Sequence, residues 1–475
     1  MTVKKIKYGM KVLINIRGRR WLHLIFMILV AQSCDQWIDP EINVNPDEPA
    51  DASMETLLSF IEADVAFKMG GSSELIGNQG IWLQQLDGID RQALSMSNYI
   101  FDPFDVTLTF DDAYAEVLMD AKVLAGKAIE QGSPWNFGVA NILSAFTLGQ
   151  LTDTWGDIPW TEALQGDAIT QPVYDSQESI YNVIQALLDQ AIDSLSVEND
   201  RTGINGDYYY NGDPLKWIKA AHALKARYYL HLSKRWGKQA FDQALEQVVL
   251  AFSTNEDDLQ FNFGSGETES NPFYQFMNER DNARMGAYFI NLMKATNDPR
   301  LVVFAAPDEQ GDYSGSEPGQ ADASASRPGQ AVAAPDSPVY LITWVEMLFT
   351  KAEALLKIGA DETEVSDVLF LAVSRSLDKY NVTDLAWLDE YDQKISILAG
   401  EDLYKEIMTQ KYIATFYQPE AFHSWRRTGY PVIPPNPNGE TGEIPRRFLY
   451  SISEQVFNPN MPKGISITDR VWWDE

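Results

Sequence analysis

Few side chains in this sequence have the type and spacing that catalysis or metal binding requires. His222 and His231 fall on one predicted helix, but their separation places them about 180° apart on its surface, so they cannot share a metal ion. The sequence contains no HExxH, no GxSxG and no glycine-rich phosphate loop. Its single cysteine permits neither an internal disulfide nor a cysteine-based zinc site. We therefore expect no catalytic residues, no metal site and no cofactor, while calcium held by scattered loop oxygens stays open.

Two carboxylates have a spacing that suggests a structural role. Glu346 and Glu353 lie on one face of an apolar segment that is predicted to be helical. Buried carboxylates need partners, and the guanidinium groups of Arg426 and Arg427 are candidates because their geometry suits a carboxylate. We expect these four residues to brace helices rather than to bind a ligand.

The remaining reactive group is the thiol of Cys34. Residues 1–20 carry seven basic side chains and no acid, and residues 21–31 are mostly apolar but too short to span a bilayer. This order is typical of a secretory signal. The cysteine that follows it resembles the one in a bacterial lipobox, where the thiol receives a diacylglyceryl group. We predict a signal peptide at 1–33, lipidation at Cys34 and an extended tether at 34–52. An ordinary cleaved signal and a twin-arginine signal are the alternatives.

The net charge of the chain limits the classes of molecule that it can bind. The net charge is −31, and removal of residues 1–33 would make it more negative because that segment carries only basic groups. Such a charge disfavours nucleic acid and anionic lipid as partners. With 45% hydrophobic and 12% aromatic residues, the chain can fill a large core.

Hydrophobic periodicity predicts a mainly α protein. Apolar residues recur at helical spacing in 213–237, where Asp213 and Pro214 form a start signal, and in 338–360, which Gly359 can end. Many predicted helices form pairs with small residues at the contact, as in tetratricopeptide-like repeats. We expect one helical domain at 53–475 with few short strands. The other predicted helices lie near 53–69, 74–87, 109–131, 137–151, 176–196, 239–252, 284–296, 362–378 and 401–417, and long irregular segments are expected at 152–175, 305–338 and 428–465.

Five stretches together resemble the SusD/RagB family, in its SusD-like branch. They are WGDIPWTEAL (155–164), NDPRL (297–301), PVYLITWVEMLFTKAEALLK (338–357), EIMTQKYIATFYQPEAFHSWRRTGYP (406–431) and IPRRFLYSISEQVFN (444–458). The resemblance implies a fold of tetratricopeptide-like helix pairs packed against a loop-rich, ligand-facing side. It also implies an outer-membrane lipoprotein of Bacteroidetes that faces the cell exterior, binds an oligosaccharide or a peptide without catalysis, and passes it to a SusC-like TonB-dependent transporter.

Candidate ligand contacts follow from the chemistry of sugars, whose C–H faces stack on aromatic rings and whose hydroxyls bond to polar side chains. Segment 77–105 has the densest mixture of aromatic and polar side chains, so it is the first candidate for the ligand site. Segment 269–276 is the second candidate, and the loop that contains Tyr313 is the third. Core packing is the alternative for each of these aromatic residues. The predicted ligand-binding residues are Trp82, Arg91, Asn98, Tyr99, Phe101, Phe104, Tyr274 and Tyr313.

Two other functions remain open at this stage. One is a helical-repeat scaffold of the outer membrane that binds only proteins. The other is a periplasmic glycan hydrolase, for which two carboxylates would be needed. The sequence does not identify the ligand, because aromatic loops suit many glycans as well as peptides.

Overall fold

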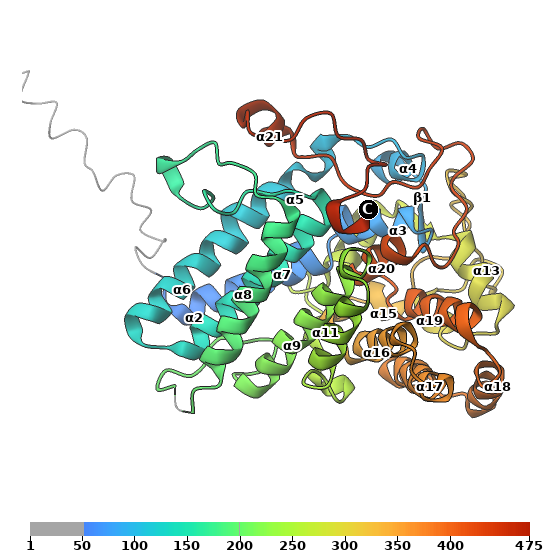
Figure 1. Ribbon diagram of the computed structural model, residues 1–475. Coiled ribbons are helices and arrows are strands. Elements are labelled where there is room, and N and C mark those ends of the chain that lie inside the picture. Colours follow the sequence, from blue (N-terminus) through green and yellow to red (C-terminus); the bar gives the residue numbers. More distant parts are fainter. Residues whose placement is uncertain (1–51, 199) are drawn as a thin grey trace, which may run out of the picture. The chain divides into compact units, whose positions relative to one another are not determined.

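The computed structural model describes residues 52–198 and 200–475 (Figure 1). The predicted signal peptide, Cys34 and nearly all of the predicted tether lie outside these residues. Met54–Glu475 forms one compact unit of the chain. Within the described residues, no helix is both long enough and apolar enough to cross a membrane.

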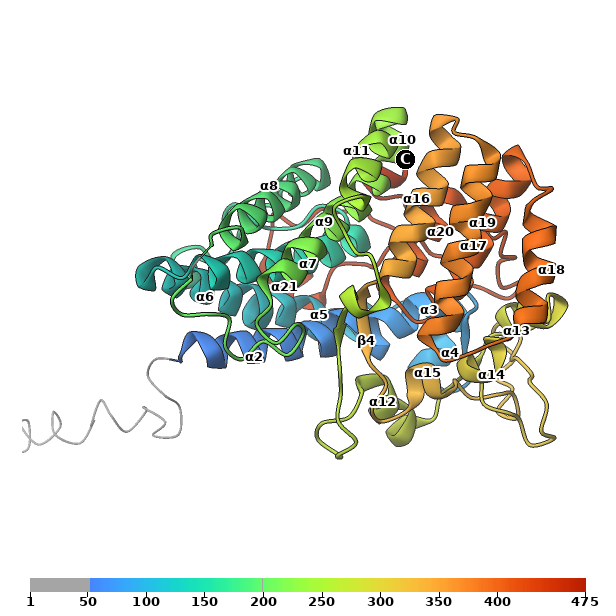
Figure 2. The same cartoon turned by 90° about the horizontal axis from the view of Figure 1, so that it is seen from below.

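Long helices dominate the fold, and each one packs against the next along the chain (Figures 1 and 2). Adjacent members form helix pairs of the tetratricopeptide-like kind, as the sequence predicted. The two halves of the series are joined by contact between α11 and α16, although 95 residues of chain separate these helices. The series comprises α6 (Met119–Gln131), α7 (Pro134–Trp155), α8 (Gln177–Leu195), α9 (Pro214–His231), α11 (Lys238–Val248), α16 (Trp344–Ile358), α17 (Glu362–Lys379) and α19 (Gly400–Ala414).

Capping residues set the ends of these helices where the sequence predicted. The Asp213 carboxylate accepts a hydrogen bond from the Leu215 amide at 2.9 Å, and Pro214 occupies the first position of α9. Gly359 ends α16 in the left-handed conformation, with φ of 85°.

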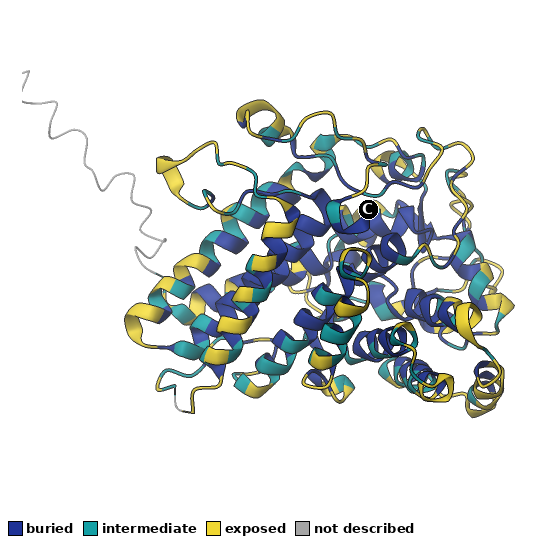
Figure 3. Ribbon diagram, in the orientation of Figure 1, coloured by how far each residue is buried: buried dark blue, intermediate teal, exposed yellow. Residues whose placement is uncertain are grey.

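Helix α7 is buried along most of its length. Every residue of 138–155 is buried, including polar ones (Figure 3). Helices α6, α8 and α9 all contact it, so it has no solvent-facing side. Buried hydroxyls on α7 are satisfied inside the helix, since Ser144 and Thr147 each donate to the carbonyl four residues earlier.

The segment between α11 and α16 contains most of the strands. Strand β2 (Leu259–Phe261) pairs antiparallel with β4 (Val339–Ile342), and β3 (Ala283–Met285) pairs antiparallel with β1 (Leu86–Gly88). The same segment holds the short helices α12 (Pro272–Arg280), α13 (Ala287–Ala295), α14 (Leu301–Phe304) and α15 (Gln330–Ala333). Strands β1 to β4 have three or four residues each, which agrees with the prediction of few short strands.

Two predicted helices begin later than the sequence indicated. Residues 339–342 form β4 rather than the first turn of α16, because this β-branched and aromatic run pairs with β2. The helix then starts at Trp344, where the Thr343 hydroxyl accepts a hydrogen bond from the Glu346 amide at 3.1 Å. Likewise, 284–285 belong to β3, and α13 begins at Ala287.

Several short helices were not predicted from the sequence. Helix α20 (Pro419–Thr428) is buried over nearly its whole length although it is mostly polar, and α18 (Leu385–Ile395) follows a short turn. Irregular segments connect the rest and gather, with α21, along the upper edge of Figure 1. The remaining helices are α2 (Met54–Asp64), α3 (Asn78–Trp82), α4 (Arg91–Ser97), α5 (Thr107–Asp112), α10 (Ser233–Trp236) and α21 (Ile452–Phe457).

Two helical glycines provide a matched test of this packing. An alanine Cβ at Gly149 of α7 would overlap the buried Tyr228 ring, whereas one at Gly126 of α6 would meet nothing within 4 Å. We expect Gly149→Ala to lower the free energy of unfolding by about 1–3 kcal/mol through overpacking. Gly126→Ala should raise it by about 0.5–1 kcal/mol through helix propensity. Urea unfolding measures both values, and equal effects of the two substitutions would contradict the packing of α7 on α9.

Candidate ligand-binding site

A cavity of about 310 Å³ lies where residues 73–108 meet residues 273–283. Its volume falls in the range of small-molecule sites. The two parts of its wall are held together by β1 and β3, whose register pairs Leu86 with Met285 and Gly88 with Ala283. The structure thus brings together segments 77–105 and 269–276, which the sequence ranked first and second as ligand-binding material.

Local capping presents an aromatic ring at the rim of this cavity. The Asp102 carboxylate accepts a hydrogen bond from the Phe104 amide at 2.9 Å, and Pro103 begins a short 3-10 turn over Pro103–Val106. This turn directs Phe104 outward, and its side chain is 70% exposed. The opposite wall begins at Asn271, whose side chain caps α12 by accepting from the amides of Phe273 and Tyr274.

Gly88 allows α4 to approach β1 closely below the cavity. A Cβ at this position would collide with the Ala93 carbonyl. The Ser97 hydroxyl accepts a hydrogen bond from the Gly88 amide at 2.8 Å, which holds the helix against the strand. Residues Gln92 and Ala93 of α4 can therefore line the cavity.

The apolar part of the wall is aromatic and aliphatic. Phe104 and Leu108 are largely exposed, and Phe276 is partly exposed beside them. Phe273 is buried behind Phe276 and stacks on Tyr417 with ring centroids 4.1 Å apart. Flat apolar faces of this kind suit the C–H face of a sugar ring.

The polar part of the wall includes an amide that lacks a partner. Asn282 is 3% exposed, and its Oδ1 accepts no hydrogen bond from any residue that the structure describes. This oxygen has almost no accessible surface, so the polar groups that a ligand can reach belong to other lining residues. Asn78, Gln92 and Arg280 also line the cavity and add further donors.

Two carboxyl groups lie in the same wall, and each already has a partner. Glu74 accepts a hydrogen bond from the Thr109 hydroxyl at 3.0 Å, and Asp105 accepts one from the Gln92 amide at 2.8 Å. Burial raises the pKa of Glu74 and that of Asp105. These groups can accept hydrogen bonds from sugar hydroxyls.

Trp82 and Tyr99, which the sequence predicted as ligand contacts, are buried in this structure. Trp82 is 0% exposed, and its indole N–H donates to the Met96 carbonyl at 3.2 Å. The Tyr99 hydroxyl is also buried and accepts a hydrogen bond from the Asn436 amide at 2.8 Å. Neither residue lines the cavity, and the polar group of each already has a protein partner, so both residues pack in the core, which is the alternative that the sequence left open.

The other predicted residues lie at or near the surface, but only Phe104 lines the cavity. Arg91 is exposed beside Asp90, and Phe101 is half-buried against Trp82 and Phe448. Asn98, Tyr274 and Tyr313 are also half-buried.

The sequence analysis did not identify Arg280 and Asn282, which line the cavity. The polar turn NERDNAR (278–284), which lies beside segment 269–276, was a signal that could have indicated them.

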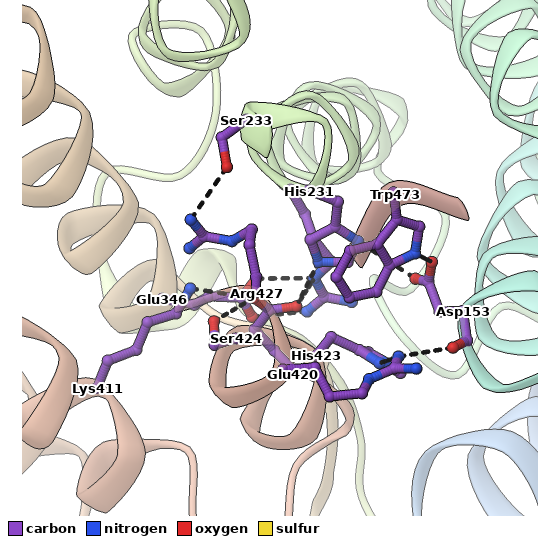
Figure 4. Close-up of polar contacts among 12 residues, drawn as sticks. Asp153, His231, Ser233, Glu346, Lys411, Glu420, His423, Ser424, Arg427 and Trp473 are labelled. Carbon is purple, nitrogen blue, oxygen red and sulfur yellow. Dashed lines mark hydrogen bonds and ion pairs between the residues drawn. The ribbon is translucent and has the colours of Figure 1, made fainter. Parts of the chain in front are cut away.

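A second cluster of titratable groups lies in the interior (Figure 4). His231 of α9 contacts two carboxylates, with its Nε2 at 2.9 Å from Glu420 Oε2 and its Nδ1 at 3.3 Å from Asp153 Oδ2. Lys411 donates to Glu420 at 3.1 Å, and the Trp473 indole donates to Asp153 at 2.8 Å. These residues are essentially inaccessible to solvent, so we assign the cluster a structural role.

The pKa values in this cluster follow from its charges. Burial would lower the pKa of His231, but the Glu420 and Asp153 carboxylates outweigh it and raise that pKa. Burial lowers the pKa of the neighbouring His423 to about 3, so this ring is neutral. The raised pKa favours the charged form of His231, whose contacts with Glu420 and Asp153 join α7, α9 and α20.

Glu346 and Glu353 both have arginine partners, one of them as the sequence predicted. Arg427 of α20 forms a two-pronged pair with Glu353 at 2.5 and 2.6 Å. Glu346 instead pairs with Arg227 of α9 at 2.6 and 2.7 Å. Arg426 donates to the backbone carbonyls of Asp153 and Arg446, each at 2.6 Å.

Within residues 52–198 and 200–475, no group of three or more His, Cys, Asp or Glu side chains is arranged to hold a metal ion.

Comparisons with known proteins agree with this architecture. A SusD-like family model, described as "Starch-binding associating with outer membrane", matches residues 46–451. A SusD/RagB family protein from Bacteroides thetaiotaomicron has a TM-score of 0.79 at 23% identity, covering 89% of this chain and 99% of that one. A chitin-binding SusD homologue from Flavobacterium johnsoniae has a TM-score of 0.77 at 20% identity, covering 89% and 98%. No curated protein matches the sequence.

The Glu353–Arg427 pair can be tested against an exposed carboxylate. Burial alone would raise the pKa of Glu353, but Arg427 outweighs it and holds that pKa below its usual value. We expect Glu353→Gln to lower the free energy of unfolding by about 3–5 kcal/mol at neutral pH, because Arg427 stays buried without a counter-charge. Glu364→Gln, at an exposed position of α17, should change it by less than about 0.5 kcal/mol.

The same pair has a defined pH dependence. The pKa of Glu353 is lowered in the folded state. Its contribution to the free energy of unfolding is therefore fully present above the unfolded-state pKa, and it is lost as the pH falls through the folded-state pKa. The difference between wild type and Glu353→Gln in chemical denaturation should therefore shrink toward acid. A difference that grows toward acid would contradict the assignment.

Proposed function

The chain belongs to the SusD-like family of outer-membrane nutrient- and carbohydrate-binding proteins, and on this premise we propose that it is a surface-exposed lipoprotein that binds an oligosaccharide. In this proposal Cys34 carries the lipid, and the protein delivers its ligand to a SusC-like TonB-dependent transporter without catalysing a reaction. The family description supports a carbohydrate ligand and an association with the outer membrane.

The observation that carries the proposal is the cavity bordered by Phe104 and Asn282. It combines an exposed aromatic face with the accessible polar side chains of Asn78, Gln92 and Arg280. Pyranose rings offer an apolar face and hydroxyl donors in the same molecule, so they match both features. Segments that are far apart in the sequence supply the two residues, and β1 and β3 fix their relation.

The glycan class is proposed from two of these similarities. The family description names starch, and one of the solved structures is of a chitin-binding protein. We therefore propose α-glucan or N-acetylglucosamine oligomers as ligands, with a peptide as the alternative. Maltoheptaose and chitotetraose are the corresponding probes.

A glycan hydrolase is the second candidate, because Glu74 and Asp105 lie in the cavity wall and have raised pKa values. A general acid needs such a pKa, but a hydrolase also needs a second carboxylate that stays ionised. We expect the purified protein to leave both probes intact over days, as followed by mass spectrometry. Turnover that disappears in Glu74→Gln would show instead that the protein is a hydrolase.

Phe104→Ala tests the cavity as the ligand site. We expect it to weaken binding of the recognised probe by roughly tenfold, or about 1–2 kcal/mol, in isothermal titration calorimetry, because one stacking face is lost. Phe457 of α21 is also 70% exposed but does not line the cavity, so Phe457→Ala is the matched control and should leave the affinity unchanged. Equal losses in both variants, or loss in neither, would contradict this site.

The proposed anchor is tested at Cys34. In cells fed a clickable fatty acid, the wild-type protein should incorporate the label and sediment with the outer membrane. Cys34→Ser should lose the label and appear in soluble fractions, because a chain without acyl groups has no strong hold on the bilayer. A wild-type protein that is unlabelled and soluble would contradict the anchor while leaving ligand binding untouched.

A further inference from the structure

Arg280 supplies a positive charge to one wall of the cavity bordered by Phe104. It is the last residue of α12, its side chain is exposed, and it lines the cavity. Its guanidinium makes no hydrogen bond and no ion pair with any residue that the structure describes. The adjacent Asp281 does not neutralise it, because Arg284 and Arg327 already pair with that carboxylate. The five N–H donors of Arg280 are therefore left for a ligand.

Glu74 supplies a carboxylate from the opposite wall of the same cavity. The Thr109 hydroxyl donates to its Oε2 at 3.0 Å, whereas its Oε1 receives no hydrogen bond from the described residues. Burial raises the pKa of Glu74, and the positive charge of Arg280 opposes that rise, so the two groups are near enough to interact. No ion pair joins them, and a gap therefore separates the guanidinium from the carboxylate.

A hydroxyl group matches this gap because it can accept a hydrogen bond and donate another. The guanidinium only donates and the carboxylate only accepts, so each needs the half of a hydroxyl that the other leaves unused. One hydroxyl bonded to both groups would hold them about 4–6 Å apart, and two adjacent hydroxyls would bridge a wider gap. A sugar with a carboxyl group fits less well, since its charge would also face Glu74 and Asp105, which line the same cavity.

The aromatic part of the wall directs the edge of a sugar toward these groups. A pyranose ring that stacks on Phe276 or Phe104 has its hydroxyls at the ring edge. Arg280 follows Phe276 by four residues on α12, so the two side chains share one face of that helix. The planar fork of the guanidinium forms paired hydrogen bonds, which suits two oxygens on neighbouring carbon atoms.

We propose that Arg280 and Glu74 together bind two adjacent free hydroxyls of one hexose residue, and that this pair selects α-glucan over N-acetylglucosamine oligomers. Each internal residue of an α-glucan such as maltoheptaose has free hydroxyls on its second and third ring carbons. In a chitin oligomer an acetamido group replaces the first of these, so its internal residues lack such a pair. The inference rests on the proposed function and decides between the two glycan classes that it names.

Calorimetric titration of the purified protein with maltoheptaose and with chitotetraose tests this selection. We expect the wild type to bind maltoheptaose roughly tenfold more tightly, because a site built to bond a hydroxyl rejects a ligand that lacks it. Arg280→Gln and Glu74→Gln should each weaken maltoheptaose binding by roughly tenfold and leave the weaker chitotetraose binding nearly unchanged. Equal wild-type affinities for the two probes would overturn the inference.

Arg91→Gln is the matched control, because Arg91 is also an exposed arginine but does not line the cavity. It should leave both affinities unchanged, and losses equal to those of Arg280→Gln would show a general effect of charge and overturn the inference. The Arg280→Gln variant should keep the wild-type melting temperature, since its guanidinium has no partner among the described residues.

The double variant Arg280→Gln/Glu74→Gln tests whether the two groups act on the same hydroxyls. If they do, removing the second group costs less once the first is gone, so the combined loss of maltoheptaose affinity should be smaller than the product of the two single losses. Losses that multiply would contradict a shared contact.

The outcomes also distinguish this inference from the proposed function. Binding that Phe104→Ala weakens while Arg280→Gln leaves it unchanged would overturn the role of Arg280 and Glu74 and leave the cavity as the ligand site. A preference for chitotetraose with the same effect of Phe104→Ala would do likewise. If neither probe binds the wild-type protein, both proposals fail.

Discussion

A set of buried charges fixes the relation between the helical series and the end of the chain. His231, Glu420 and Asp153 join α7, α9 and α20, and the Glu353–Arg427 pair joins α16 to α20. These groups have no access to water, so each is stable only while its partners are in place. Because α20 is mostly polar, these contacts determine its position together with the packing of Phe422. The fold therefore depends on electrostatic complementarity at its centre.

The position of α20 also determines the base of the candidate site. Phe422 of α20 packs against Trp82 of α3, with ring centroids 5.8 Å apart, and Trp82 packs in turn on Phe448 near the C-terminus. Helix α3 and the turn before it then form one wall of the cavity bordered by Phe104. A contiguous path of packed side chains thus connects the buried charges to a surface where a sugar can stack. The helices supply rigidity, and the irregular segments supply the groups that face a ligand.

The sequence predicted those features that depend on local pattern. Apolar periodicity located the long helices, and Asp213 and Gly359 marked two of their ends because capping is a short-range property. It failed at 339–342, where pairing with a distant strand outweighed the helical pattern, and at α20, whose stability comes from ion pairs. Arginine and glutamate composition indicated the Glu353–Arg427 pair, but the choice of Arg227 for Glu346 depends on the tertiary arrangement.

Site residues were less predictable than the segments that contain them. Composition indicated 77–105 and 269–276, and the structure places both at one cavity. It could not show that Trp82 packs inward while Phe104 faces outward, because this depends on the turn that begins at Asp102. Nor could composition show that Arg280 and Asn282 line the same cavity as Phe104, because the pairing of β1 with β3 brings these residues together.

The long chain excursion between α11 and α16 has an evolutionary consequence. Strands β2 and β4 pair near its two ends, so residues 262–338 leave and re-enter the scaffold at neighbouring points. Other parts of the excursion are held in the core, since β3 pairs with β1 and the buried Arg300 donates to Gln410 of α19. The excursion supplies Asn282 and α12, which line part of the candidate cavity. Its exposed residues can therefore change the shape of this cavity in evolution, while the paired strands and Arg300 keep the excursion attached to the helices.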